Sequence, residues 1–294
     1  MQKNNRFALG TAQIGVPYGI ANQSGQIDLG DAAKILEYAW LAGLDTVDTA
    51  ISYGDSEKRL GDIGVGQWQI ISKLPSRPAN CKNAYTWVKE SVRDSLVRLK
   101  VSKLSGLLLH HSQQLLDPEG ESIYRAMTEL KDVGLLEKIG ISIYSPKELD
   151  VLWPNFKFDL VQTPFNIIDR RIATSGWLSK LYESGTEVHA RSIFLQGLLL
   201  MNNLQRPAYF NQWQSLWKHW DSWLDGNSMS PLQACVEFAM SQREISRIVI
   251  GIDSLKQLQQ VLDSVKESNS LALPPITLTN DDLDLINPSH WNRS

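Results

Sequence analysis

Four side chains whose types suit proton transfer follow short apolar runs in the first part of the chain. They are Asp48, which ends one run, Tyr53 five residues later, Lys73, which follows the next run, and His110, which follows a third. A lysine ammonium beside a phenol favours phenolate and lowers the pKa of the tyrosine, so that the phenol can serve as a general acid. A carboxylate holds that ammonium in place, and an imidazole can orient a substrate carbonyl. Together the four types predict a proton-transfer site.

The elements that must position these residues are short apolar runs that alternate with longer amphipathic stretches, a pattern typical of parallel strands joined by helices. Eight runs predict strands: Phe7–Leu9, Thr46–Asp48, Gln69–Ser72, Leu104–Leu109, Lys138–Ser142, Leu160–Thr163, Glu187–Arg191 and Arg247–Ile250. Helices are predicted between them, for example over Asp31–Ala42, Ala84–Leu99, Glu121–Lys131 and Leu255–Val265. Eight such units predict an α/β fold, a single (β/α)8 TIM barrel whose active site is formed by the loops after the strands. An open doubly wound sheet is the alternative, but the sequence lacks its Gly-x-Gly-x-x-Gly fingerprint.

An extended segment follows the seventh predicted strand, from Ser192 to about Gln242. Its tryptophans recur at helical spacing, which predicts a helix that packs bulky side chains onto the barrel; they are Trp213, Trp217, Trp220 and Trp223. A flap whose aromatic rings border a ligand is the alternative, and the sequence leaves it open. The sequence closes with a short tail, Asn287–Trp291. Because no linker rich in Pro, Gly or Ser interrupts the pattern, residues 1–294 are predicted to form one domain.

The composition excludes several classes of protein. Lys and Arg number 29 against 32 Asp and Glu, and no basic run stands out, so nucleic acid is not an expected partner. No apolar stretch approaches the roughly 20 residues of a membrane span, and the N-terminus shows no signal-peptide pattern, which predicts a cytoplasmic protein without a membrane partner. Two cysteines and five scattered histidines give no metal-ligand spacing, so no metal is expected. The sequence indicates no oligomeric state.

The segment around Asp48 and Tyr53 resembles the signature of the aldo-keto reductase family. The resemblance rests on Gly43–Ala50 (GLDTVDTA), Tyr53-Gly54, Ser56-Glu57 and Leu60-Gly61, and it continues in Ser72-Lys73 and in Leu107–His110. It implies a barrel that binds a nicotinamide cofactor without a Rossmann unit. It also implies reduction of an aldehyde or ketone to the alcohol, with the hydride from the nicotinamide and the proton from Tyr53.

The same resemblance implies a set of cofactor contacts. They are Gly10, Thr11, Ser142, Gln162, Arg191, Ser192, Gln196, Gly197, Gly251, Ser254 and Gln257. Arg191 stands where many relatives place an aromatic residue that stacks on the nicotinamide. The segment Ile250–Ser254 with Gln257 resembles the family's site for the adenosine ribose phosphate. Asp253 lies within it, and its negative charge disfavours a bound phosphate. The resemblance favours NADP(H) over NAD(H).

The expected partner is a small-molecule carbonyl substrate, with a sugar and an aromatic compound as the candidate classes. The residues expected to border it are Tyr18, Tyr144, Phe165 and Trp291. Two other functions stay open: a non-catalytic barrel that binds the cofactor as a sensor or partner subunit, and a lyase that forms a Schiff base on Lys73. Asp48 argues against the lyase, because a nearby carboxylate raises the pKa of a lysine. His189, inside the seventh predicted strand, is expected to be a buried and fully hydrogen-bonded histidine.

Overall fold

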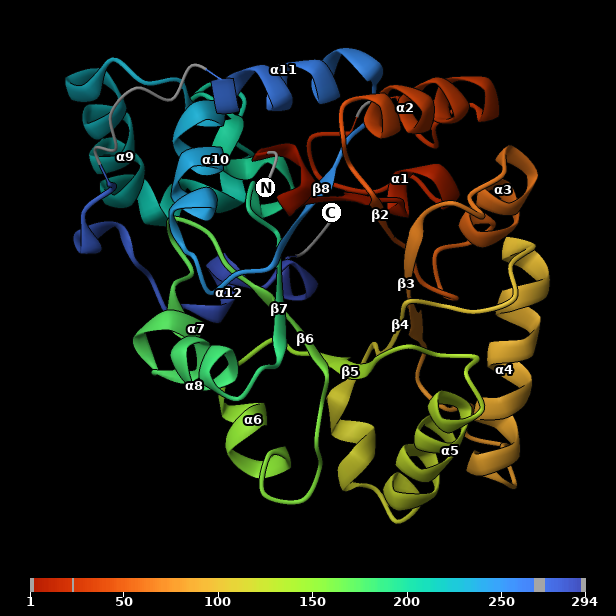
Figure 1. Cartoon of the computed structure of the whole chain (residues 1–294). Helices are drawn as coiled ribbons and strands as arrows, with labels where there is room; N and C mark the ends of the chain where they lie inside the picture. The colour runs from red at the N-terminus through yellow and green to blue at the C-terminus, as the bar shows by residue number, and fades with distance from the viewer. Residues whose placement is uncertain (1–2, 23, 267–272, 292–294) are drawn as a thin grey trace.

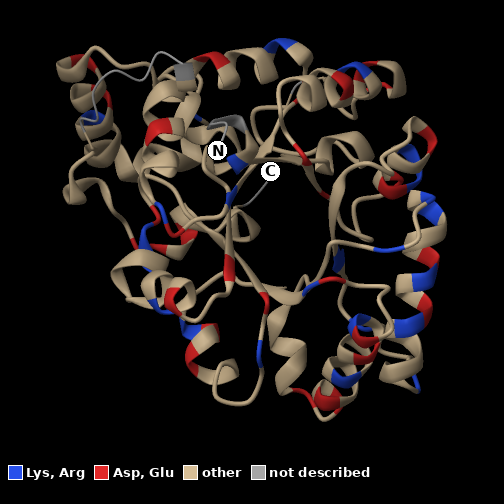
Figure 2. Cartoon of the chain, in the orientation of Figure 1, with Lys and Arg blue, Asp and Glu red and all other residues tan. Residues whose placement is uncertain are grey.

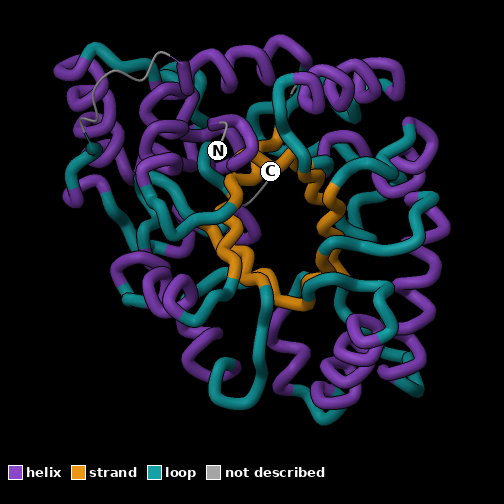
Figure 3. Tube along the Cα trace, in the orientation of Figure 1, coloured by secondary structure: helices purple, strands orange, loops and turns teal. Residues whose placement is uncertain are grey.

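The computed structural model describes residues 3–22, 24–266 and 273–291, and its central feature is a closed barrel of parallel strands. Viewed along the barrel axis, the strands form a ring with helices on its outside (Figure 3). Each strand pairs with its sequence neighbours, and β1 closes the ring against β8. The strands are β1 (Phe7–Gly10), β2 (Thr46–Asp48), β3 (Gln69–Leu74), β4 (Gly106–Leu109), β5 (Ile139–Ser142), β6 (Leu160–Pro164), β7 (Glu187–Arg191) and β8 (Arg247–Gly251). The predicted (β/α)8 barrel is confirmed.

The helices connect the strands and cover the outside of the ring (Figure 1). The α-helices are α1 (Ala12–Gly15), α2 (Leu29–Leu41), α3 (Ser56–Ile63), α4 (Ala84–Leu99), α5 (Gly120–Asp132), α6 (Lys147–Leu152), α7 (Arg171–Thr174), α8 (Trp177–Glu183), α9 (Gln214–Asn227), α10 (Pro231–Ser241), α11 (Leu255–Lys266) and α12 (Leu283–Ile286). The 3-10 helices are η1 (Lys3–Arg6), η2 (Ser112–Leu116), η3 (Leu195–Leu200), η4 (Ala208–Trp213), η5 (Ile276–Leu278) and η6 (Pro288–His290). The predicted helix over 84–99 has the bounds of α4.

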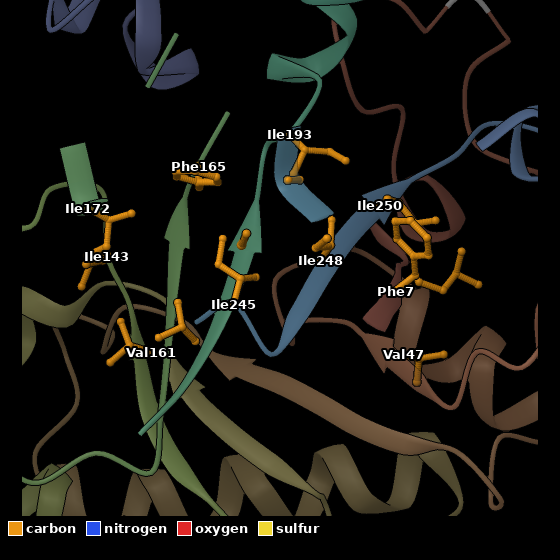
Figure 4. Packing of buried hydrophobic residues seen from close by; sticks show 14 of the residues in the cluster. Phe7, Val47, Ile143, Val161, Phe165, Ile172, Ile193, Ile245, Ile248 and Ile250 are labelled. Carbon is orange, nitrogen blue, oxygen red and sulfur yellow. The ribbon is translucent and has the colours of Figure 1, made fainter. Parts of the chain in front are cut away.

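Apolar side chains on the outer face of the barrel pack against the helices and are buried there. Val47, Val161 and Ile248 are fully buried in this layer, and Figure 4 shows several of its members on neighbouring strands. The opposite, inward face of the strands holds a smaller cluster of Ile71, Leu108 and Leu160. Because side chains alternate along a strand, the next inward positions after this cluster lie closer to the carboxyl ends of the strands.

The long segment after β7 contains η3, η4, α9 and α10 rather than a bare loop. Trp213, Trp217 and Trp220 are buried against the rest of the core, and Trp223 stacks on Trp220 with 5.7 Å between ring centroids. The indole N–H of Trp217 donates to the carbonyl oxygen of Phe210 at 2.8 Å. The tryptophans therefore pack α9 onto the body of the protein, as the helical spacing predicts.

Acidic and basic side chains are mixed over the outer helices, as α4 illustrates (Figure 2). Within the described residues, no helix has both the length and the apolar character that crossing a membrane requires.

Candidate active site

The centre of the site is a buried ion pair at the carboxyl ends of β2 and β3. The Nζ atom of Lys73 lies 2.5 Å from Oδ1 of Asp48 and donates a second hydrogen bond to the carbonyl oxygen of Thr49 at 3.0 Å. The other carboxylate oxygen, Oδ2, accepts from the side-chain amide of Gln162 at 2.7 Å. Both charged side chains are at most 4 % exposed. The pair is stable in this setting because both carboxylate oxygens and the ammonium have partners.

A tight turn after β2 places Tyr53 above this pair. The backbone N–H of Tyr53 donates to the carbonyl oxygen of Ala50, and its own carbonyl oxygen accepts from Ser56. Gly54 follows with a φ of 54°, and a Cβ on Gly15 would lie 1.8 Å from the carbonyl oxygen of Tyr53. The turn therefore depends on glycine both for its backbone conformation and for the close approach of α1.

The four residues predicted from the strand ends meet in the structure. The Nζ atom of Lys73 lies 5.2 Å from the centroid of the Tyr53 ring. The ring of His110 meets that of Tyr53 edge-on, with 5.7 Å between centroids. Asp48, Tyr53 and His110 border one cavity, and Lys73 lies beneath them.

The pKa of Tyr53 is not lowered, as the neighbouring Lys73 had led us to expect, but raised. Burial raises the pKa of Tyr53 well above its usual value, and the negative charge of Asp48 raises it further. The positive charge of Arg191 lowers it but does not outweigh these effects. The expected net lowering of this pKa is therefore wrong for the protein as it stands, because desolvation disfavours phenolate. The phenol consequently holds its proton at neutral pH, which a proton donor requires.

His110 is neutral at physiological pH. Burial, together with the nearby positive charge of Lys73, lowers the pKa of His110 to about 3. Its Nδ1 atom lies 3.1 Å from the hydroxyl oxygen of Ser52, and its ring stacks on that of His111 at 5.5 Å. A neutral imidazole can donate one N–H to a substrate oxygen, which suits an orienting role.

Burial also sets the direction in which the pKa of Lys73 shifts. Desolvation lowers the pKa of Lys73, although the charge and the hydrogen bond of Asp48 raise it in part. The expectation that Asp48 keeps this pKa high describes one contribution correctly, but the net direction is downward because the side chain is 1 % exposed.

The cavity at the carboxyl ends of the strands has a volume of about 350 Å³. Its lining extends from Tyr53 and His110 to α11. Among the residues predicted for cofactor or substrate, those that line it are Gly10, Thr11, Tyr18, Tyr144, Gln162, Arg191, Ser192, Gln196, Gly197, Gly251 and Gln257. One continuous cavity thus contains most of the residues implied by the family resemblance.

Two predicted substrate residues lie away from this lining. Phe165 is 1 % exposed and stacks on Phe238, with 5.1 Å between ring centroids. Trp291 packs edge-on against Phe210 and donates its indole N–H to the carbonyl oxygen of Leu285 at 3.1 Å. Both rings belong to the hydrophobic core, because burying a large apolar surface is more favourable than leaving it at a cavity wall.

Two of the predicted cofactor residues also lie outside the cavity lining. The hydroxyl of Ser254 accepts from the backbone N–H of Gln257 at 3.3 Å, at the start of α11, and does not line the cavity. Ser142, at the end of β5, is fully buried and also outside the lining.

The polar atoms fit a nicotinamide cofactor at this site. Ser142 Oγ and Gln196 Oε1 are buried without a hydrogen-bond partner within the described chain. Unpartnered buried polar atoms are costly, so these two atoms are available to a ligand or to water. Gln162 donates its amide N–H to Asp48, which leaves its amide oxygen able to accept a bond from a carboxamide. These groups could pair with the amide oxygen and the amide N–H groups of a nicotinamide carboxamide.

Several cavity residues went unrecognised in the sequence. Gln13 lies against Gly251, where a Cβ would come within 2.6 Å of its amide nitrogen. Asn22 donates to Asp253 Oδ1 at 2.9 Å and thereby joins the loop after α1 to the region before α11. Gln13 follows the first strand closely, so the rule that strand-end loops form the site could have found it. Asn22 has no local signal, because its partner is far away in the sequence.

The remaining polar candidates do not form a metal site. The described residues contain no group of three or more His, Cys, Asp or Glu side chains that could hold a metal ion. His189 is buried in β7, and neither of its ring nitrogens has a hydrogen-bond partner in the described part of the protein. The expected burial is confirmed, and the carboxylate of Glu187 faces the ring, with Oε2 3.6 Å from Nε2.

Comparison with known proteins identifies relatives of this architecture. The chain is 24 % identical over 295 aligned positions to D-threo-aldose 1-dehydrogenase of a Pseudomonas species, an alignment that covers 86 % of this chain and 89 % of the relative. It is 25 % identical over 182 positions to the aldo-keto reductase YhdN of Bacillus subtilis, covering 58 % of this chain and 53 % of the relative.

Solved structures show the same fold. The holo form of the aldo-keto reductase AKR11C1 from Bacillus halodurans superimposes with a TM-score of 0.72 and 21 % identity, covering 91 % of this chain and 88 % of that one. A putative aldo-keto reductase of Pseudomonas aeruginosa gives a TM-score of 0.65 at 22 % identity, with 88 % of each chain covered. The model of the aldo/keto reductase family matches residues 6–270. The chain therefore belongs to the aldo/keto reductase family, whose activity is NAD(P)-dependent oxidation and reduction of carbonyl compounds.

Proposed function

We propose that this protein reduces an aldehyde or ketone to the corresponding alcohol, with a reduced nicotinamide cofactor as hydride donor and Tyr53 as proton donor. The observation that carries the proposal is the placement of Tyr53 and His110 on one cavity, directly above the buried pair of Lys73 and Asp48. The two cavity-facing groups supply a proton and a hydrogen bond to a single carbonyl oxygen. Lys73, held in place by Asp48, supplies a positive charge 5.2 Å from the centroid of the phenol ring.

The chain contributes the proton and the orientation of the substrate. His110 donates a hydrogen bond to the carbonyl oxygen and holds it near the phenol of Tyr53. A reduced nicotinamide, when bound, would supply the hydride that the carbonyl carbon accepts. As the C=O double bond is reduced, its oxygen takes the proton of Tyr53, and the resulting phenolate is stabilised by Lys73 until it regains a proton from solvent. Ser142, Gln162 and Gln196 would hold the carboxamide of the cofactor.

NADP(H) is the cofactor we propose in preference to NAD(H), on the resemblance of residues 250–257 to the family's ribose-phosphate site. The support is the start of α11, where backbone N–H groups favour an anion. Asp253 opposes it, because this carboxylate lines the same cavity.

Replacement of Asp253 by Asn therefore tests the preference. Removal of one like charge near a phosphate should raise the ratio of kcat/KM for NADPH over NADH by about fivefold, mainly through a lower KM for NADPH. Steady-state rates with both cofactors and one aldehyde measure it. A selective loss of NADH activity instead would assign Asp253 to the ribose hydroxyls and reverse the proposed preference.

The substrate proposed from the cavity is a sugar or aromatic carbonyl compound. The support is the presence of Tyr18, Tyr144 and Phe194 in the lining, since aromatic rings pack against both sugar and aromatic faces. The name of the Pseudomonas relative, an aldose dehydrogenase, places aldoses in the first test panel. We place the activity in the cytoplasm, in keeping with the free thiols of Cys81 and Cys235.

The experiment that tests the proposed function follows the near-ultraviolet absorbance of NADPH and NADH with a panel of aromatic aldehydes and aldoses. We expect consumption of cofactor that depends on the aldehyde. Cofactor binding without turnover of any carbonyl would support the non-catalytic alternative, a sensor or partner subunit.

The pH dependence follows from the two cavity-facing groups. Because the pKa of His110 is lowered to about 3, its neutral form persists as the pH falls through the ordinary histidine range near 6.5. Because the pKa of Tyr53 is raised, its proton persists as the pH rises past neutrality. We expect kcat/KM for reduction to vary by less than about twofold between pH 6 and 9. A limb with a midpoint near 6.5 that disappears in His110→Gln would contradict this assignment.

The lyase alternative draws support from the lowered pKa of Lys73, which is the condition for a Schiff-base nucleophile. The geometry around Lys73 argues against the lyase. Nζ of Lys73 is enclosed by Asp48 and the carbonyl oxygen of Thr49, and the side chain does not line the cavity. Treatment with borohydride in the presence of aldehydes should therefore give no adduct on Lys73, as read by peptide mass; a trapped adduct would favour the lyase.

A further inference from the structure

We infer that Arg191 makes this protein selective for carbonyl substrates that carry a carboxylate or a similar planar anionic group. This inference rests on the proposed function and adds a substrate class to it. Arg191 ends β7 and lines the cavity together with Tyr53 and His110. An anion held by Arg191 and a carbonyl oxygen held by Tyr53 and His110 would fix a short substrate at two points.

The guanidinium of Arg191 is held in place from several sides. Its Nη2 atom donates to the carbonyl oxygen of Ile143 at 3.0 Å, and its Nη1 atom lies 3.3 Å from the hydroxyl oxygen of Ser192. The guanidinium lies over the ring of Tyr144, with 4.5 Å between Cζ and the ring centroid. A cation fixed in this way loses little conformational freedom when it binds a ligand, which favours affinity.

The charge of Arg191 has no carboxylate partner among the described residues. By contrast, Arg98, Arg171 and Arg206 each form an ion pair within 4.0 Å of an acidic side chain. The acids that share the cavity with Arg191 are engaged elsewhere: Asp48 by Lys73 and Gln162, and Asp253 by Asn22. A partly buried guanidinium in this situation is suited to a planar anion, which it can bind through two parallel N–H bonds.

Arg191 also lies within electrostatic reach of the reacting groups. Its positive charge lowers the pKa of Tyr53, of Lys73 and of His110. Because Arg191, Tyr53 and His110 line one cavity of about 350 Å³, a substrate that contacts all three carries its anionic group only a few bonds from the carbonyl. Short oxo-acids and formyl-substituted aromatic acids meet that requirement, whereas a phosphate at the far end of a long chain does not.

The test compares acids with neutral analogues of nearly equal shape. The pairs are 4-oxobutanoate with 4-methylpentanal and 4-carboxybenzaldehyde with 4-formylbenzamide. For the wild type we expect kcat/KM to be higher for the acid by about 10- to 100-fold in at least one pair, the range expected of a hydrogen bond to a charged group. In Arg191→Gln that ratio should fall to about one, whatever the change in kcat/KM for the neutral compound.

Matched variants separate this effect from other changes. Arg93→Gln removes the same charge from the exposed face of α4 and should keep the wild-type ratio. Arg191→Lys keeps the positive charge but lacks the planar guanidinium with its two parallel N–H donors. Its ratio of kcat/KM for the acid over the neutral compound should therefore lie between those of the wild type and Arg191→Gln. Quenching of tryptophan fluorescence by NADPH reports whether each variant is folded and binds cofactor.

An unchanged ratio in Arg191→Gln would overturn the inference. So would a loss of NADPH affinity in that variant with the acid preference intact, because Arg191 would then serve the cofactor. Absence of turnover with every aldehyde would contradict the proposed function instead. Calorimetric titration of the protein–NADPH complex with terephthalate and with terephthalamide still decides in that case: we expect Arg191→Gln to weaken only the terephthalate, by about tenfold or more, and equal affinities in the wild type would overturn the inference.

Discussion

Replacement of Tyr53 by phenylalanine should lower kcat for carbonyl reduction by about 10²- to 10⁴-fold, the usual contribution of a positioned general acid. The substitution removes one hydroxyl and leaves the ring against His110 and Lys73, so cofactor affinity should stay within about threefold of the wild type. Steady-state rates at saturating aldehyde give kcat, and quenching of protein fluorescence gives the dissociation constant for NADPH. The effect should fall on kcat rather than on cofactor binding, because the proton is transferred only in the chemical step.

A matched control is Tyr182→Phe, which removes the same hydroxyl from an exposed ring on α8 and should retain the wild-type rate. Retention of more than about a tenth of the wild-type kcat by Tyr53→Phe would show that another group or water supplies the proton.

Replacement of Lys73 by methionine should reduce both turnover and stability. The substitution leaves the carboxylate of Asp48, which is at most 4 % exposed, without its cation. Loss of one partner of a buried ion pair typically costs about 3–5 kcal/mol in the free energy of unfolding. The phenolate formed at Tyr53 would also lose its nearest ammonium, so kcat should fall by about 10²-fold or more. Urea unfolding and steady-state kinetics measure the two effects.

The double variant Asp48→Asn with Lys73→Met separates these effects. It removes the unpaired charge, so much of the stability lost in Lys73→Met should return, whereas turnover should not. Wild-type stability of Lys73→Met would mean that the ion pair contributes little to the fold. Wild-type turnover would remove Lys73 from the catalytic site.

The barrel was predictable from local patterns because each strand and helix carries its own periodicity. Thr46–Asp48 and Glu187–Arg191 are strands with the predicted bounds. The third predicted strand was too short: β3 continues to Leu74, because its end pairs with β4 through Lys73 and Leu74. Polarity at Lys73 suggests a strand end, but an inward-facing position at the mouth of a barrel can bury a charge when a partner is present.

The meeting of Asp48, Tyr53, Lys73 and His110 was predictable because the carboxyl ends of all strands lie on one face of a barrel. The direction of individual aromatic rings was not. Phe165 and Trp291 have residue types suited to a substrate wall, yet both lie in the core. Hydrogen bonds such as that from Gln162 to Asp48 join residues 114 positions apart, and nothing near either residue in the sequence indicates the other. The raised pKa of Tyr53 depends on burial, which only the folded chain defines.

Transfer of deuterium from cofactor to product tests the central claim most directly. The protein would be incubated with NADPH carrying two deuterium atoms at the nicotinamide C4 and with each aldehyde of the panel, and the alcohol analysed by mass spectrometry. We expect one deuterium on the carbinol carbon for each cofactor oxidised, and formation of this alcohol that is about 10²- to 10⁴-fold slower in Tyr53→Phe than in the wild type. An alcohol without deuterium, or no alcohol at all from a protein that binds the cofactor, would contradict the assignment of this barrel as a carbonyl reductase.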